Sequence, residues 1–156
     1  MQKEITNEQI TGILQKYTAG RESIIKCLHE LQDSHPQNYI SKEILDETAK
    51  HFKLTKGQIF GITSYYSMFS LKPRGRHLIR LCKSPVCNML GSQSILDHIQ
   101  NKTGLKPGET SADGAITLEL AECIGECDKA PAMMINREFY TGLDEEKINE
   151  ILSKLK

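Results

Sequence analysis

The sequence predicts a mixed α and β fold, in which a helical bundle over residues 1–75 precedes a small α/β domain over residues 76–156. The first half carries apolar residues at helical spacing, separated by helix-capping and helix-breaking residues. The second half changes to short apolar runs typical of strands, with helical segments between and after them. A length of 156 residues suits one or two small domains with useful cores.

Capping signals and helical periodicity predict four helices in the first half. Thr6 and Gln9 form a capping box ahead of the first helix, and Thr55 and Gln58 form another ahead of the fourth. Ser41 is a favourable N-cap for the third helix. The expected helices span residues 7–17, 21–33, 41–52 and 56–69.

The third and fourth helices also allow a different interpretation, because a short turn between two helices is typical of a DNA-binding helix-turn-helix. Residues 56–69 would be the recognition helix, yet Lys56 is the only basic residue in it, and DNA readers need phosphate-neutralising side chains there. Lysines ahead of this helix could supply some of them. We interpret Tyr65 and Tyr66 as core and packing residues rather than as a stacking platform.

The second half is expected to follow the order strand, helix, strand, strand, helix. A predicted strand over residues 77–81 leads into Cys82, and a second strand over residues 116–120 ends near Cys123. Pro85 is expected to hold the loop after the first strand extended or turned. The other expected elements are a helix over residues 87–102, strands over residues 132–135 and 139–140, and a last helix capped by Asp144.

Charge and hydropathy patterning argue against several classes of protein. Lys plus Arg and Asp plus Glu both number 20, so no net charge favours nucleic acid or an acidic membrane surface. Residues 1–10 lack the apolar run of a signal peptide, and no segment approaches the roughly 18 apolar residues of a membrane span. We therefore expect a protein that is cytoplasmic, or peripheral on the cytoplasmic side of a membrane complex, with no nucleic-acid partner and no direct membrane insertion.

Four of the five cysteines form two clusters, Cys82-x4-Cys87 and Cys123-x3-Cys127. Cytosolic chains do not use disulfides as a scaffold, so clustered thiols point to metal ligation or redox chemistry. Both pairs follow predicted strand ends, where a fold can bring four thiolates together around a soft metal centre. Cys27 flanks the apolar stripe of the second helix, and we interpret it as a packing residue.

Three kinds of site compete for the four clustered thiols. Structural zinc sites favour tighter C-x2-C knuckles, and redox disulfides favour a C-x-x-C spacing that is absent here. A 2Fe–2S cluster accepts looser loops whose peptide N–H groups approach the sulfurs, and Gly91 and Gly125 permit such an approach. The spacing therefore favours an iron–sulfur cluster, with zinc as the alternative.

No catalytic residues are predicted. The five histidines are scattered and none lies in a triad context, and Gly-x-Gly phosphate loops are missing from the sequence. A protein that carries a redox cluster and has no site for NAD or flavin needs partners that supply and remove electrons.

Longer segments around the cysteines resemble the 24 kDa subunit family of NADH dehydrogenases, which includes the E subunit of bacterial respiratory complex I. Related subunits occur in NAD(P)-linked hydrogenases and in NAD-dependent formate dehydrogenases. The resemblance covers nearly the whole chain, and Ser64 and Tyr65 depart mildly from the family's usual Thr and Phe. The segments that carry it are residues 63–69, 73–76, 82–92 and 122–131.

The resemblance implies an N-terminal helical bundle and a C-terminal thioredoxin-like ferredoxin domain. It places the ligands of one 2Fe–2S cluster on Cys82, Cys87, Cys123 and Cys127, and it assigns no ligand role to Cys27. It also removes most of the support for a helix-turn-helix, because the third and fourth helices match the family's own bundle.

The function implied by the resemblance is one-electron transfer beside a flavin. A partner iron–sulfur subunit would bind FMN and NAD(P), and further iron–sulfur subunits would complete the complex, whereas this chain alone would not oxidise NADH. The implied parent assembly is complex I, a hydrogenase with or without electron bifurcation, a formate dehydrogenase or a transhydrogenase. The alternative is a zinc-binding structural protein or a DNA-binding helix-turn-helix protein.

Overall fold

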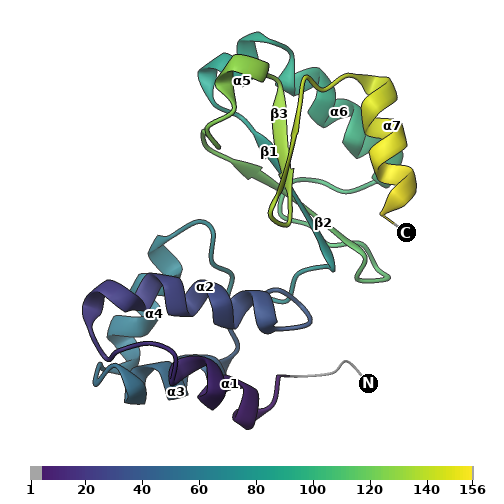
Figure 1. The fold of residues 1–156 in the computed structure, drawn as a ribbon. Helices are drawn as coiled ribbons and strands as arrows, with labels where there is room; N and C mark the ends of the chain where they lie inside the picture. The colour runs from purple at the N-terminus through teal and green to yellow at the C-terminus, as the bar shows by residue number, and fades with distance from the viewer. Residues whose placement is uncertain (1–4, 156) are drawn as a thin grey trace. The chain divides into compact units, whose positions relative to one another are not determined.

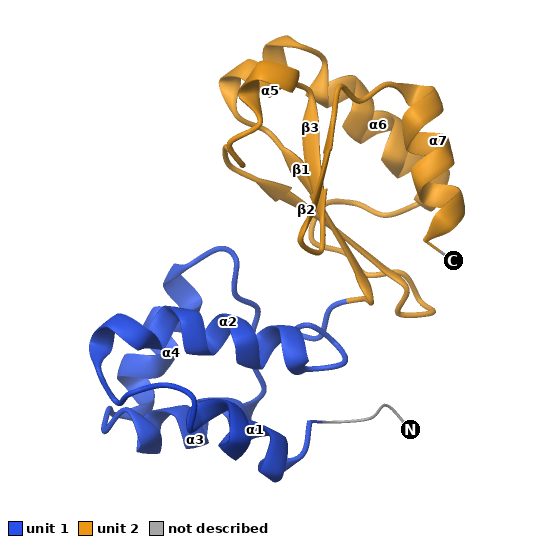
Figure 2. Ribbon diagram, viewed as in Figure 1, with its two compact units in different colours: residues 1–74 blue, residues 75–156 orange. Residues whose placement is uncertain are grey.

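A computed structural model describes residues 5–155 of the chain (Figure 1). The chain divides between Arg74 and Gly75 into two compact units, an all-helical first unit and a mixed second unit (Figure 2). No helix among the described residues combines the length and the apolar character that crossing a membrane requires.

The first unit consists of helices whose N-terminal caps follow the sequence signals. Thr6 and Thr55 each accept a hydrogen bond from the backbone N–H three residues on, and the Gln side chain there accepts a bond from the backbone N–H of the threonine, which confirms both capping boxes. Ser41 caps the third helix as expected. The elements are α1 (Asn7–Leu14), the 3-10 turn η1 (Arg21–Ser23), α2 (Ile24–Ser34), α3 (Lys42–His51) and α4 (Lys56–Tyr65).

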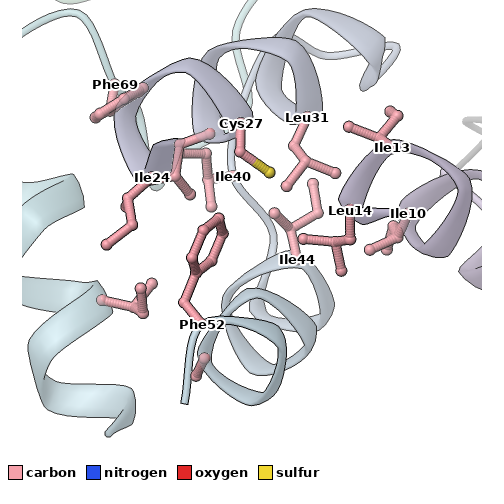
Figure 3. Packing of buried hydrophobic residues seen from close by; sticks show 13 residues of the cluster. Ile10, Ile13, Leu14, Ile24, Cys27, Leu31, Ile40, Ile44, Phe52 and Phe69 are labelled. Carbon is pink, nitrogen blue, oxygen red and sulfur yellow. The ribbon is translucent and has the colours of Figure 1, made fainter. Parts of the chain in front are cut away.

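The core of the first unit is aliphatic and draws on all four α-helices. Ile10, Leu28, Ile44 and Ile59, one from each helix, are fully buried, and Figure 3 shows part of this core. Burying an aliphatic side chain of this size contributes roughly 1.5–3 kcal/mol. Packing of these apolar faces therefore stabilises helices that are too short to persist alone.

Two expectations for this unit are wrong in detail. The first helix ends at Leu14, and α4 ends at Tyr65 because Tyr66 is extended. The expected core role of the two tyrosines also fails, since Tyr65 is 81% exposed and Tyr66 is 46% exposed. Tyr65 lies six residues after the buried Ile59, about 240° around the helix, and so falls away from the buried face.

The second unit is built on a four-stranded mixed sheet with the spatial order β2-β1-β3-β4. β1 runs parallel to β2 and antiparallel to β3, and β3 runs antiparallel to β4. The strands are β1 (His77–Cys82), β2 (Ile116–Ala121), β3 (Ala132–Ile135) and β4 (Glu138–Thr141). The helical elements are α5 (Pro85–Met89), α6 (Ser92–Thr103), η2 (Cys127–Lys129) and α7 (Glu145–Lys154).

Helices α6 and α7 lie side by side against one face of this sheet (Figure 1). Ile79 and Leu118 of the sheet pack against Ile99 of α6 and Ile148 of α7, and all four side chains are almost completely buried. The mixed α and β fold class is therefore confirmed. The expected order strand, helix, strand, strand, helix is incomplete, because two helices lie between β1 and β2 and three strands lie between α6 and α7.

The single helix expected over residues 87–102 is wrong, because the structure has two helices there. Gly91 adopts φ +99°, a left-handed conformation that interrupts a helix and that glycine adopts without steric cost. Pro85 does not lie in an extended loop either. It begins α5, where its fixed φ suits the first helical position and its missing N–H costs no hydrogen bond.

Gly75 brings the start of the second unit close against β2. Its N–H donates to Thr117 Oγ1 at 2.7 Å, and a Cβ atom placed on it would lie 2.8 Å from the backbone carbon of Ile116. Such a contact is shorter than real Cβ contacts, so the backbone here requires glycine. The adjacent His77 N–H then donates to Ala115 O at 2.8 Å, which begins the pairing of β1 with β2.

Candidate metal centre

The parallel pairing of β1 and β2 brings the two cysteine clusters to one edge of the sheet. Parallel neighbours end at the same edge, and Cys82 lies opposite Ala121 in the register. The chain after Cys82 continues into α5 with Cys87, and the chain after Ala121 continues into the loop with Cys123 and Cys127. All four predicted site residues therefore lie at the end of β1 or on the segments that follow β1 and β2 at this edge of the sheet.

Cys82 and Cys87 form a buried pair. Each is 1% exposed, and the two thiols lie close enough for each to shift the pKa of the other. The pair is held by Ser92, whose hydroxyl donates to Cys82 O at 2.5 Å, and by Ser84, whose Oγ lies 3.2 Å from Cys82 Sγ. These contacts connect the end of β1 to α5 and to the start of α6.

Cys123 and Cys127 form a second pair that lies closer to solvent. Their Sγ atoms are 3.3 Å apart, Cys123 is exposed and Cys127 is half-buried. Gly125 lies between them at φ +97°, so the loop turns tightly enough for both thiols to face each other. The expected role of Gly125 in letting peptide N–H groups approach the sulfurs stays a prediction.

The loop of the second pair also contacts the first pair. The backbone N–H of Ile124 faces Cys82 Sγ closely enough to lower the pKa of that thiol. An apolar cluster surrounds this contact, in which Ile124 and Ala130 pack against Cys82, Cys87 and Ala132. One peptide N–H is thus directed at a sulfur, the kind of contact predicted for an iron–sulfur loop.

The pKa shifts of Cys82, Cys87 and Cys127 show that the clustered cysteines influence one another. Burial alone would raise the pKa of Cys82, but hydrogen bonds from Ser84, Cys87 and the Ile124 N–H outweigh it and lower the pKa. Burial and the bond to Cys82 raise the pKa of Cys87. The hydrogen bond with Cys123 raises the pKa of Cys127, and charge on Cys82 and Cys87 raises it further.

The raised pKa values of Cys87 and Cys127 mean that these thiols lose their protons readily only when a cation compensates the charge. A metal centre supplies that charge and deprotonates the thiols it binds. The chemistry of this donor set, four cysteine sulfurs without a carboxylate or an imidazole, is the one that iron–sulfur clusters and structural zinc both use.

The grouping of the thiols in two pairs fits a binuclear centre. The two irons of a 2Fe–2S cluster take two cysteines each, whereas a structural zinc ion takes four donors around one point. Two cysteine pairs that follow neighbouring strand ends are suited to the first arrangement.

Cys27 has no part in this centre, in agreement with its predicted packing role. It belongs to α2 in the first unit, it is fully buried, and its side chain points into the helical core (Figure 3). Burial, together with the nearby charge of Glu30, raises the pKa of Cys27 to about 12. The side chains that surround Cys27 in this core are apolar, which is the environment of a packing residue.

The helix-turn-helix alternative also loses support from the surface of α3 and α4. Lys50 is paired with Glu47 at 2.6 Å, and Lys56 is paired with Asp46 at 2.8 Å. Two of the lysines that would have contacted phosphates are thus engaged by carboxylates of α3, which would themselves repel DNA.

The sequence reasoning missed two hydroxyl groups of the centre, those of Ser84 and Ser92. Ser-Pro at the start of a helical segment is typical of an N-cap followed by its first helical residue, which would mark the position of Ser84 but not the contact of its hydroxyl with Cys82. No local signal marks Ser92, since its partner Cys82 O lies ten residues away.

Comparisons with known proteins agree on one family. The family described as thioredoxin-like [2Fe-2S] ferredoxin matches residues 10–156. The E subunit of the NADH-quinone oxidoreductase of Aquifex aeolicus (strain VF5) is 35% identical over 134 residues, which are 86% of this chain and 82% of that protein. The alpha subunit of the NAD-reducing hydrogenase HoxS of Cupriavidus necator is 33% identical over 150 residues, which are 96% of this chain and 25% of that protein.

A solved structure supports the same fold. A chain from a crystal structure of an NAD+-reducing [NiFe]-hydrogenase in the air-oxidized state aligns with a TM-score of 0.76 at 24% identity. The alignment covers 97% of this chain and 24% of that chain. This chain therefore spans about a quarter of the hydrogenase chains that it matches.

Proposed function

The chain belongs to the thioredoxin-like [2Fe-2S] ferredoxin family, and from this we propose that it is the electron-transfer subunit of an NAD(P)H-linked oxidoreductase complex. Members of this family carry one 2Fe–2S cluster. The observation that carries the proposal is the meeting of two cysteine pairs at one sheet edge, with a peptide N–H from one loop directed at a sulfur of the other.

We propose Cys82, Cys87, Cys123 and Cys127 as the cluster ligands, with each pair on one iron. A cluster bound there accepts and releases one electron at a time. The chain's own residues hold the four sulfurs in position. The end of β1 and α5 fix the first pair, and the tight turn at Gly125 fixes the second.

The apolar cluster around the first pair has a role in the same proposal. Ile124, Ala130 and Ala132 cover Cys82 and Cys87, so water has little access to these two sulfurs. Excluding water lowers the local dielectric constant, which strengthens every hydrogen bond that reaches a sulfur. Hydrogen bonds to the ligand atoms tune the potential of a metal centre.

We further propose that the electrons are exchanged with the flavin of a partner subunit that binds FMN and NAD(P), in a complex with further iron–sulfur subunits. The names of the relatives support this proposal, since one belongs to an NADH-quinone oxidoreductase and another to an NAD-reducing hydrogenase. The remaining three quarters of the hydrogenase chain would correspond to a separate partner of this chain.

The ligand assignment is tested on anaerobically purified protein. We expect two irons and two acid-labile sulfides per chain, together with the EPR signal of a reduced 2Fe–2S cluster. Cys123→Ala should abolish cluster assembly, whereas Cys27→Ala is the matched control and should keep the full visible spectrum, because Cys27 lies in the helical core. One zinc ion without sulfide, or loss of colour in the Cys27 variant, would contradict the assignment.

The partner proposal is tested with the assembled protein. NADH alone should leave the cluster of the isolated chain oxidised, whereas NADH should reduce it once the co-purifying flavin subunit is added. Reduction of the isolated chain by NADH at the same rate would show that a partner is not needed.

A further inference from the structure

The Ser84 side chain is placed unusually for a residue that begins a helix. Ser84 is the N-cap of α5, with φ −62° and ψ 160°, yet its hydroxyl makes no capping hydrogen bond. An N-cap serine ordinarily accepts a hydrogen bond from a backbone N–H of the first turn, and that bond is worth about 1 kcal/mol to the helix. The hydroxyl instead lies 3.2 Å from Cys82 Sγ.

The surroundings of Ser84 leave the sulfur as the partner of this hydroxyl. Ser84 is 6% exposed, so water does not compete freely for its Oγ atom. The carbonyl of Ser84 is used separately, since it accepts from Asn88 N at 2.9 Å in the first turn of α5. The carbonyl of Ser84 therefore serves the helix, whereas its backbone N–H and its side chain both face Cys82. The side chain also acts on the neighbouring Cys87.

Cluster binding sets the direction of this hydrogen bond. Between a serine hydroxyl and a free thiol either group can donate. A cysteine that ligates a metal has lost its proton, so only the hydroxyl has a proton to give. Ser84 then donates to a charged sulfur, and a charge-assisted bond is roughly twice as strong as a neutral one.

We propose that Ser84 is a positioning residue that raises the reduction potential of the cluster by donating an O–H···S hydrogen bond to Cys82. The proposal rests on the ligand assignment of the proposed function. Reduction adds one negative charge to the centre, and part of that charge falls on the ligand sulfurs. A donor aimed at one sulfur stabilises the reduced state more than the oxidised state, and the potential rises.

The structure offers a matched comparison in Ser92. Both serines are buried and both hydrogen-bond Cys82, but Ser92 donates to the carbonyl oxygen and Ser84 lies against the sulfur. Loss of either hydroxyl loosens the segment around Cys82. Only loss of the Ser84 hydroxyl removes a proton donor from a ligand atom.

The test is a redox titration of the isolated protein, followed by EPR, for the wild type and three variants. In Ser84→Ala we expect the equilibrium constant for one-electron reduction to fall about tenfold, which is a downward shift of about 59 mV. Ser84→Thr keeps the hydroxyl and should return the potential close to the wild-type value. Ser92→Ala should shift the potential much less than Ser84→Ala.

A second measurement covers the case in which Ser84→Ala fails to assemble a cluster. Exchange into D2O should shift the Fe–S stretching bands in resonance Raman spectra of the wild type and of Ser84→Thr, because an exchangeable proton bonds a ligand sulfur. Any Ser84→Ala protein that does assemble should show a smaller shift. Absence of a D2O shift in the wild type would overturn the proposal.

The outcomes separate this inference from the proposed function. If the wild type holds no iron and sulfide, the ligand assignment fails and the role of Ser84 fails with it. If the wild type holds the cluster but Ser84→Ala has the wild-type potential, only the role of Ser84 is overturned. Equal shifts in Ser84→Ala and Ser92→Ala would also overturn it, because they would show a general loosening of the segment.

Discussion

Replacing Gly75 by alanine should destabilise the second unit, because the new methyl group has no room. The added Cβ would lie 2.8 Å and 2.9 Å from two backbone atoms of Ile116, and 3.0 Å from a backbone atom of Ala115. These atoms belong to the peptide units that pair with the start of β1, so they cannot rotate aside as a flexible side chain would.

The size of the effect follows from three contributions. Overpacking of a close contact costs about 1–3 kcal/mol. A shift of the backbone also weakens the 2.7 Å bond from Gly75 N to Thr117 Oγ1, which contributes about 1 kcal/mol. Alanine has less conformational freedom than glycine in the unfolded chain, which offsets about 0.4–1 kcal/mol of this loss of stability. The free energy of unfolding should therefore fall by about 1–3.5 kcal/mol.

Urea denaturation followed by circular dichroism measures this change, with Gly61→Ala as the matched control. Gly61 lies inside α4 and a Cβ there meets nothing within 4 Å. The control should therefore gain about 0.5–1 kcal/mol from the better helix propensity of alanine. The steric reasoning is refuted if Gly75→Ala is as stable as the wild type, or if both variants shift in the same direction.

Two further predictions concern the first unit. Its free energy of unfolding should fall as the pH rises from about 9 to about 12. The folded state raises the pKa of Cys27 from 9.0 and of Tyr17 from 10.0 to about 12, so the unfolded chain releases these protons first. Denaturation at several pH values should show that the stability of Cys27→Ala falls less steeply with pH, and an unchanged dependence on pH would contradict the link to burial. Thr55→Ala should cost about 1 kcal/mol by removing the cap of α4, measured by the same denaturation. Thr11→Ala, at an exposed position inside α1, is the control and should not lower the stability, because alanine has the better helix propensity.

The parts of the fold that the sequence predicts well depend on residues close together in the chain. Each capping box is complete within four residues, and Thr6 and Thr55 form the expected bonds. The order of the strands follows from short apolar runs separated by turn residues, and the strand that leads into Cys82 lies within one residue of its predicted bounds. Residues close together in the chain specify these features, so a single amino-acid sequence is enough to predict them.

The errors arise where tertiary contacts or backbone geometry decide. A helix tolerates an isolated glycine, so the residue type alone does not show that Gly91 is left-handed and separates α5 from α6. An aromatic residue in a helical run is usually buried, but the side of α4 that packs inward is set by Ile59 and Thr63, and Tyr65 falls on the other side. The contact of Ile124 N–H with Cys82 depends on pairing of distant strands.

The parallel pairing of β1 with β2 imposes an order on how the centre forms during folding. Cys82 and Cys87 are neighbours in the chain and come together as soon as α5 forms, whereas the second pair joins them only after the whole crossover with α6 has closed. Closing a long loop between parallel strands is a slow and late step. A partly folded chain therefore offers iron only half of its ligands at a time, and we expect cluster insertion to follow folding of the second unit rather than to nucleate it.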